Sequence, residues 1–251
     1  MKEDYIIELK DVHKSFNSKK VHTGVSLSIK RGENITILGG SGSGKSVLLK
    51  EITGLIKVDR GEVIIEGENI VPMSEEELIH VRKKIGMLFQ GAALFDSLTV
   101  AENIAYPIRE HFKHTEGEIR DIVAKNLELV GLPGIEDKYP SDLSGGMKKR
   151  VGLARAMAME PKILLYDEPT TGLDPPNISR INHLIRNLQG RFGITGVVIT
   201  HDVVNSAFPV SDRIAFLYRG KIVFVGTVEE AKNTNIKELS DFIHGRLDEE
   251  D

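Results

Sequence analysis

Residues 35–55 read ITILGGSGSGKSVLLKEITGL: an apolar run, a glycine-rich loop and a helical pattern follow one another. The loop at 39–46 fits the pattern G-x-x-x-x-G-K-[ST], in which backbone N–H groups surround phosphate groups. In this pattern Lys45 is predicted to reach the β- and γ-phosphates, and the Ser46 hydroxyl is predicted to ligate Mg²⁺. A flexible Gly/Ser turn is the alternative interpretation. The strand before the loop and the helix after it favour a nucleotide site instead.

The rest of the chain alternates short apolar runs with helical patterns, which is typical of an α/β fold with a mostly parallel sheet. The clearest strands are predicted at 35–38, 85–89, 163–166 and 196–200. Peripheral or hairpin strands are predicted at 63–66, 213–218 and 221–225. The predicted helices span 45–54, 75–83, 116–130, 144–158, 175–189 and 236–245. The stretch 91–160 contains no convincing strand, so we expect a helical insert there.

Two carboxylates follow a buried strand in the stretch ILLYDEP, residues 163–169. Ligands bind at the carboxyl ends of the strands in open α/β sheets, where Asp167 and Glu168 would lie. We expect Asp167 to belong to the Mg²⁺ shell, and Glu168 to orient and deprotonate the attacking water. A solvated strand end is the alternative for such a pair. The presence of the phosphate loop favours the catalytic interpretation.

Two further polar residues stand where predicted strands end: Gln90 after IGMLF, and His201 after GVVIT. Gln90 is predicted to contact the metal or the water, and His201 the γ-phosphate. Taken singly, each fits an ordinary surface position equally well. Phe16 lies in the polar stretch HKSFNSKK. It is predicted to stack on an adenine ring, although a single aromatic residue also fits a core position.

A second candidate phosphate site lies in SDLSGGMKKR, residues 141–150. A serine and two glycines open a predicted helix, whose first N–H groups are free to bind an anion. A serine N-cap alone would explain the serine. Two glycines in the first turn weaken a helix, however, so the pattern favours a ligand site.

These motifs occur in a fixed order: GGSGSGKS, Gln90, LSGGM (143–147), ILLYDEP, TGLD (171–174) and His201. The set resembles the nucleotide-binding subunits of ABC transporters over residues 5–225. The resemblance implies a single domain over 1–251 with a P-loop NTPase (RecA-like) core and a peripheral antiparallel β-subdomain. It assigns these two parts to 1–90 and 158–225, an inserted α-helical subdomain with the signature motif to 91–157, and a C-terminal helical tail to 226–251.

The resemblance also implies ATP and Mg²⁺ as cofactors and a head-to-tail homodimer with two ATP molecules at the interface. The nucleotide would be held by Phe16, Gly39, Gly40, Ser41, Gly42, Ser43, Gly44, Lys45, Ser46 and Val47. The partner's nucleotide would be capped by Ser144, Gly145, Gly146 and Met147. Hydrolysis would depend on Glu168, His201 and Gln90, and the metal on Ser46, Gln90 and Asp167.

A narrower resemblance covers 85–111, with GENIVPMSEEEL at 67–78 and Met147 in place of the family's usual Gln. These segments look like the ATPase subunits of Mla/MCE-type lipid transporters. Such a role implies movement of phospholipid or another lipid between inner and outer membranes. The partners would be an integral permease that docks near Gln90–Asp96, an MCE-domain lipid-binding protein and a STAS-domain subunit. The chain would lie on the cytoplasmic face of the inner membrane. Leu94 and Phe95 would line the permease groove or belong to the core.

Composition separates the alternatives. The chain has 251 residues, no Cys, and 33 Lys and Arg against 37 Asp and Glu. The acidic balance argues against a nucleic-acid partner, and the absence of Cys fits a reducing compartment. No run approaches the roughly 18 apolar residues of a membrane span. An ATPase of another solute transporter is the nearest alternative. Soluble ABC ATPases that act on ribosomes commonly carry two such domains, whereas this chain has one phosphate loop. P-loop kinases and GTPases do not need a motif such as LSGGM, so its presence argues against both classes.

Overall fold

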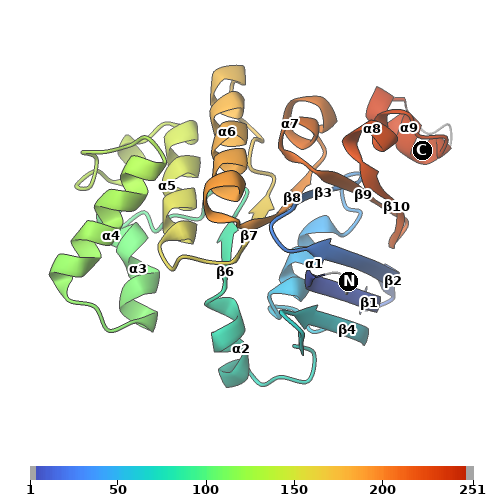
Figure 1. Ribbon diagram of the computed structural model, residues 1–251, viewed down its shortest axis with the longest axis horizontal. Coiled ribbons are helices and arrows are strands. Elements are labelled where there is room, and N and C mark those ends of the chain that lie inside the picture. Colours follow the sequence, from blue (N-terminus) through green and yellow to red (C-terminus); the bar gives the residue numbers. More distant parts are fainter. Residues whose placement is uncertain (1–3, 247–251) are drawn as a thin grey trace.

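The computed structural model describes residues 4–246, and its centre is a six-stranded sheet with the order β10-β9-β3-β8-β7-β6 (Figure 1). Neighbouring strands are parallel except β9 and β10, which form an antiparallel hairpin. The strands are β3 (Asn34–Leu38), β6 (Ile85–Leu88), β7 (Ile163–Asp167), β8 (Thr195–Thr200), β9 (Arg213–Tyr218) and β10 (Lys221–Thr227). The predicted fold class is therefore confirmed. Of the two alternatives predicted for 213–218 and 221–225, the hairpin is confirmed by β9 and β10. β9 is not peripheral, because it also pairs with the central strand β3.

Both faces of the parallel sheet are covered, which explains why its strands read as continuous apolar runs. In β7, Ile163 and Leu165 face one cluster of buried side chains, and Leu164 and Tyr166 face another. The first cluster joins the sheet to α1 (Lys45–Ile52) and α2 (Glu75–Arg82). It also includes an antiparallel sheet of order β2-β1-β4-β5, which forms a separate layer in Figure 1. Its strands are β1 (Tyr5–Phe16), β2 (Lys19–Lys30), β4 (Arg60–Ile65) and β5 (Glu68–Asn69).

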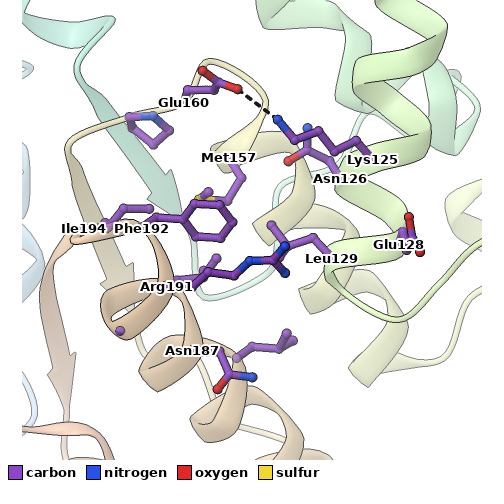
Figure 2. Close-up of a pocket in the computed structure, with 14 residues that line it drawn as sticks. Lys125, Asn126, Glu128, Leu129, Met157, Glu160, Asn187, Arg191, Phe192 and Ile194 are labelled. Carbon is purple, nitrogen blue, oxygen red and sulfur yellow. Dashed lines mark hydrogen bonds and ion pairs between the residues drawn. The ribbon is translucent and has the colours of Figure 1, made fainter.

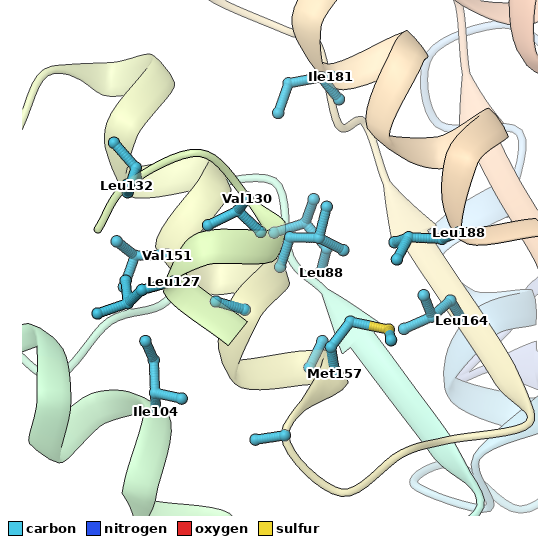
Figure 3. Close-up of a cluster of buried hydrophobic side chains, with 14 of the residues drawn as sticks. Leu88, Ile104, Leu127, Val130, Leu132, Val151, Met157, Leu164, Ile181 and Leu188 are labelled. Atoms are coloured by element: carbon cyan, nitrogen blue, oxygen red, sulfur yellow. The ribbon is translucent and has the colours of Figure 1, made fainter. Parts of the chain in front are cut away.

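The second cluster packs helices against the opposite face of the sheet (Figure 3). These are α3 (Val100–His111), α4 (Glu116–Leu129), α5 (Gly145–Met157) and α6 (Pro175–Phe192). The first three stand together at one end of the molecule in Figure 1. Between residues 91 and 160, which are all described, no strand occurs. Only helical elements therefore separate β6 from β7.

Short elements complete the chain. They are η1 (Pro140–Asp142), η2 (Val203–Ala207), α7 (Phe208–Val210), α8 (Val228–Lys232) and α9 (Lys237–His244). Because β10 continues to Thr227, the tail that we predict at 226–251 begins inside a strand, and its last residues, 247–251, lie outside the described part. Within 4–246, no helix has both the length and the apolar character needed to cross a bilayer.

Glu66 links the two sheets through three cations. It follows β4 and lies close to the ammonium of Lys162 (2.8 Å), the ammonium of Lys84 (3.2 Å) and the guanidinium of Arg31 (3.2 Å). Burial by itself would raise the pKa of this carboxyl, but hydrogen bonds from these cations lower it to about 2. Lys84 and Lys162 directly precede β6 and β7, so this carboxylate fixes the antiparallel sheet to the base of the core sheet.

We therefore expect Glu66→Gln to lower the free energy of unfolding by about 1.5–3 kcal/mol at pH 7, the range for hydrogen bonds to a charged group. A depressed pKa stabilises the fold above the unfolded value of 4.5, and this contribution is lost as the pH falls towards about 2. Urea unfolding at pH 7 and pH 3 measures the difference, with the exposed Glu62→Gln as control. Equal stability at pH 7, or a difference that grows in acid, would contradict the expectation.

Candidate active site

The phosphate loop joins β3 to α1 at the carboxyl end of the core sheet. Gly42 and Gly44 have φ angles of +73° and +103°, a backbone conformation that L side chains rarely adopt. A Cβ at Gly44 would also lie 2.7 Å from the Nε2 of His22, which is buried behind the loop. Gly40 and Ser41 are exposed, and Val47 lies in the first turn of α1. The path of the loop therefore depends on the glycine conformations at 42 and 44 and on the close packing of β2 behind Gly44.

Lys45 is folded into this loop. Its ammonium donates hydrogen bonds to the carbonyl oxygens of Gly39 (2.7 Å) and Gly40 (3.0 Å). Burial lowers the pKa of Lys45, while the charges of Asp167 and Glu168 oppose that shift. The Lys45 ammonium is therefore held by two carbonyl groups of the loop.

Ser43 supplies a second feature of the same loop. Its hydroxyl is buried and has no hydrogen-bond partner among the described residues. A buried hydroxyl without a partner is uncommon in native proteins and calls for a ligand or a water molecule. A phosphate oxygen fits this donor.

The strand register brings the predicted acidic residues to the loop. Leu38 of β3 is opposite Thr200 of β8, and Asp167 of β7 is opposite Ile199 of β8. The hydroxyl of Ser46 donates to the Oδ1 of Asp167 at 3.2 Å. Burial raises the pKa of Asp167.

This oxygen pair suits Mg²⁺, which is bound in proteins by one or two carboxylates together with substrate phosphates. Within the described chain, no three His, Asp or Glu side chains form a metal cluster. The donor set therefore fits a cation shared with a phosphate ligand.

Glu168 is held on all sides. Its Oε2 accepts hydrogen bonds from the hydroxyls of Thr171 (3.0 Å) and Thr200 (3.1 Å). Its Oε1 lies 3.0 Å from the Nδ1 of His201, whose side chain is 57% exposed. Its backbone N–H donates to the carbonyl of Ile199. The carboxylate therefore has a fixed position beside the exposed imidazole.

Gln90 and Phe16 lie at the margins of this group. Leu88 of β6 is opposite Tyr166 of β7, so Gln90 leaves its strand level with Glu168. Gln90 is exposed and makes no hydrogen bond within the described residues. Phe16 ends β1 with 42% of its surface exposed, and the ammonium of Lys14 lies 5.3 Å from its ring centroid. The structure thus leaves both side chains accessible, and their roles stay predictions.

The second phosphate motif lies elsewhere in the chain. Ser144 caps α5, and its hydroxyl accepts a hydrogen bond from the N–H of Met147 at 3.3 Å. Ser144 and Gly145 are exposed, whereas Gly146 packs so closely on Asn177 of α6 that a Cβ would lie 2.7 Å away. Among residues 4–246, no hydrogen bond joins this motif to the phosphate loop or the acidic pair. One chain therefore brings together the loop, Asp167, Glu168 and His201, and leaves Ser144 and Gly145 exposed at the start of α5.

A cleft of about 1090 Å³ lies between α4, α6 and the end of α5 (Figure 2). Met157, Arg191 and Phe192 line it, and the Lys125–Glu160 ion pair (3.2 Å) lies across one end. None of its described lining residues belongs to the predicted nucleotide site. The site is therefore an open surface at the sheet edge and not this cleft.

Sequence reasoning missed three residues that hold Glu168: Thr171, Thr200 and Lys149. Thr200 is the last residue of a predicted strand and Thr171 is the second residue after DEP, so the strand-end argument could have found both. The Lys149 ammonium donates to the carbonyl oxygen of Glu168 at 3.0 Å. That contact depends on how α5 packs against β7, which the sequence pattern does not reveal.

Comparisons with known proteins identify the family of this chain. The family described as "ABC transporter" matches residues 22–171. "Probable ribonucleotide transport ATP-binding protein mkl" of Mycobacterium leprae is 43% identical over 240 residues, which cover 96% of this chain and 69% of that protein. The "Intermembrane phospholipid transport system ATP-binding protein MlaF" of Escherichia coli is 38% identical over 243 residues, 97% of this chain and 90% of MlaF.

A solved structure extends the comparison to the fold. The dimeric ATP-binding cassette MJ0796 bound to ADP and Pi has a TM-score of 0.81 and 34% identity, and the match covers 88% of this chain and 98% of that one. Sequence and fold therefore agree over nearly the whole chain. The chain belongs to the ABC transporter family and is one of its ATP-binding, ATP-hydrolysing cassettes.

Proposed function

We propose that this chain is the ATP-hydrolysing subunit of a transporter that moves phospholipid or another lipid between inner and outer membranes. One observation carries the ATPase part: Lys45, Ser46, Asp167, Glu168 and His201 meet at a single sheet edge. The likeness to MlaF over almost its full length supports the lipid cargo. The mycobacterial relative favours ribonucleotides as a second candidate cargo, since its identity to this chain is slightly higher.

The residues would divide the work of hydrolysis as follows. ATP enters the loop, and the Lys45 ammonium exchanges the carbonyls of Gly39 and Gly40 for phosphate oxygens. Ser46, Asp167 and Gln90 would hold Mg²⁺, which when bound neutralises phosphate charge.

Glu168 orients the attacking water and accepts its proton, because its carboxylate is fixed beside the phosphate loop. His201 stabilises the γ-phosphate by a hydrogen bond from its exposed imidazole. Phe16 stacks on the adenine ring, and the remaining loop residues supply N–H groups to the phosphates.

We further propose a head-to-tail homodimer, in which Ser144, Gly145, Gly146 and Met147 of one chain cap the ATP of the other. The exposure of Ser144 and Gly145 at the start of α5 supports the proposal, as does the dimeric state of MJ0796. An N–H group or a hydroxyl bonded to a charged phosphate contributes about 1.5–3 kcal/mol. Both kinds of hydrogen bond need the γ-phosphate, so ATP favours the closed dimer and hydrolysis allows the dimer to open.

The permease is proposed to dock at Gln90–Asp96, on the cytoplasmic face of the inner membrane. Leu94 packs on the core, but Phe95 is 45% exposed and its ring lies 5.0 Å from that of Tyr106. Arg155 of α5 donates to the carbonyls of Ala92 (2.8 Å) and Ala93 (2.7 Å), so the segment has a defined shape. An MCE-domain protein and a STAS-domain subunit would complete the complex, and the subdomains would divide at 91–157 as the resemblance implies.

We expect Ser144→Arg to abolish ATP turnover while ATP binding to the monomer stays nearly unchanged. The arginine side chain would occupy the exposed N-terminus of α5, where the partner's phosphate is proposed to bind. The chain's own phosphate loop would be unchanged. Turnover is measured by phosphate release and binding by a fluorescent ATP analogue. The exposed Ser141→Arg, three residues earlier, is the matched control. Loss of ATP binding in the monomer would contradict the assignment of this motif to the partner's nucleotide.

Co-purification tests the proposed cargo. The tagged chain is isolated from native membranes in mild detergent, and its partners are identified by mass spectrometry. A permease with an MCE-domain protein would support the lipid role. A different permease with a solute-binding protein would keep the ATPase mechanism and overturn the lipid cargo. Recovery with ribosomes, or only from the soluble fraction, would overturn the transporter role itself.

A further inference from the structure

Lys149 is a buried cation that reaches the candidate catalytic site from a different part of the fold. It lies in the second turn of α5 and is only 5% exposed. Its ammonium donates to the backbone carbonyl of Glu168 at 3.0 Å, and this is its one described hydrogen bond within residues 4–246. A buried ammonium is normally paired with a carboxylate, because an isolated charge is costly to bury. Here the charges of Asp167 and Glu168 favour the ammonium, but its hydrogen bond goes to the peptide group.

The backbone of Glu168 needs such support. Its φ is +48°, a left-handed conformation that is unusual for a residue with a side chain. Pro169 follows, and a proline restricts the residue before it to extended conformations. Conformations of this kind persist only where the surroundings over-determine them. The peptide carbonyl accepts hydrogen bonds from Lys149 and, at 3.4 Å, from the N–H of Thr171.

We propose that Lys149 is a positioning residue for hydrolysis, which holds the peptide group of Glu168 and thereby aims its carboxylate at the attacking water. The hydroxyls of Thr171 and Thr200, together with His201, hold the carboxylate at the end of the Glu168 side chain. Lys149 holds the backbone carbonyl of the same residue. Without the lysine, the backbone of Glu168 relaxes towards an extended conformation. The carboxylate then moves relative to the phosphate loop, although every nucleotide-binding group is still present.

The inference rests on the proposed function, because the same helix begins with the motif assigned to the partner's ATP. Ser144 and Lys149 belong to one rigid helix, α5, and lie at its cap and in its second turn. A shift of α5 on closure of the dimer is therefore transmitted to the Glu168 peptide. Lys149 links the partner's nucleotide to the water-activating group of this chain.

A double-mutant cycle tests the proposal on the full chain. Lys149→Met is expected to lower kcat roughly 10- to 100-fold, the scale of a 1 Å misplacement, with the KM for ATP unchanged. In the Glu168→Gln background, measured by single turnover, the same change should lower the residual rate by less than about 2-fold, since a residue that acts through Glu168 has nothing left to position. Lys149→Arg, which keeps the charge, should recover most of the rate.

Lys148→Met is the matched control, because Lys148 is the adjacent lysine of α5 and its ammonium has no described partner. An unchanged kcat in Lys149→Met would overturn the inference. Equal losses in both backgrounds, or weaker ATP binding, would show a general structural role and overturn it as well. Lys149→Ala is measured in parallel in case Lys149→Met does not fold. A wild-type chain without ATPase activity would instead refute the proposed function, so the two failures are distinguishable.

Discussion

Replacing Glu168 with glutamine should lower the rate of ATP hydrolysis by about 10²–10⁴-fold, the usual contribution of a general base, while ATP stays bound. Glutamine has the same shape and keeps one carbonyl oxygen, which still accepts from the hydroxyls of Thr171 and Thr200. The amide cannot take a proton from water. In the proposed mechanism ATP closes the dimer and hydrolysis opens it, so the closed dimer of this variant should accumulate.

Light scattering at high ATP and protein concentration, together with phosphate release, measures both effects. The exposed Glu160→Gln, on the loop before β7, is the control. We expect Glu168→Gln to appear as a dimer with ATP and as a monomer with ADP. A strictly monomeric variant under these conditions would contradict the proposed head-to-tail homodimer. An unchanged hydrolysis rate would remove Glu168 from the role of base.

Lys45→Ala is expected to weaken ATP binding at least about 10²-fold, since two charge-assisted hydrogen bonds of about 1.5–3 kcal/mol each are lost. The effect is large because Lys45 acts twice. Its ammonium bridges the carbonyls of Gly39 and Gly40, and in the proposed mechanism the same ammonium meets the phosphates of ATP. Without Lys45 the loop loses the hydrogen bonds to the carbonyls of Gly39 and Gly40, together with one positive charge.

Isothermal titration with ATP measures the affinity directly. The exposed Lys113→Ala, on the loop between α3 and α4, removes an equal charge far along the chain and should leave binding unchanged. If Lys45→Ala bound ATP as tightly as the wild type, the loop at 39–46 would not be the phosphate site. If it bound ATP but did not hydrolyse it, Lys45 would act on the transition state alone.

The core of the fold was predictable because buried parallel strands read as short apolar runs. Strands β3, β7 and β8 were predicted within one residue of their observed bounds. The long strands β1 and β2 were missed. Register shifts interrupt the alternation in β1, whereas β2 alternates regularly over 25–30, so that part of it could have been predicted. Helix α3 was missed because Pro107 lies inside it and breaks the helical pattern.

The candidate site was predictable where it depends on strand ends, and hidden where it depends on packing between elements. Asp167, Glu168 and His201 each follow a recognisable strand, and parallel strands end at one edge. By contrast, the contact of Lys149 requires the docking of α5 on β7, and the contact of His22 with Gly44 requires the fit of β2 behind the loop. These contacts follow from tertiary packing, for which local patterns carry no signal.

The position of β3 has a consequence for folding of the chain during its synthesis. Its two neighbours are β8 and β9, which both lie beyond residue 171, where the family match ends. A chain synthesised only to that point would hold β3 with both edges unpaired, and pairing between distant segments is slow. Until β8 and β9 have left the ribosome, the phosphate loop of the nascent chain therefore follows a strand whose edges are both unpaired.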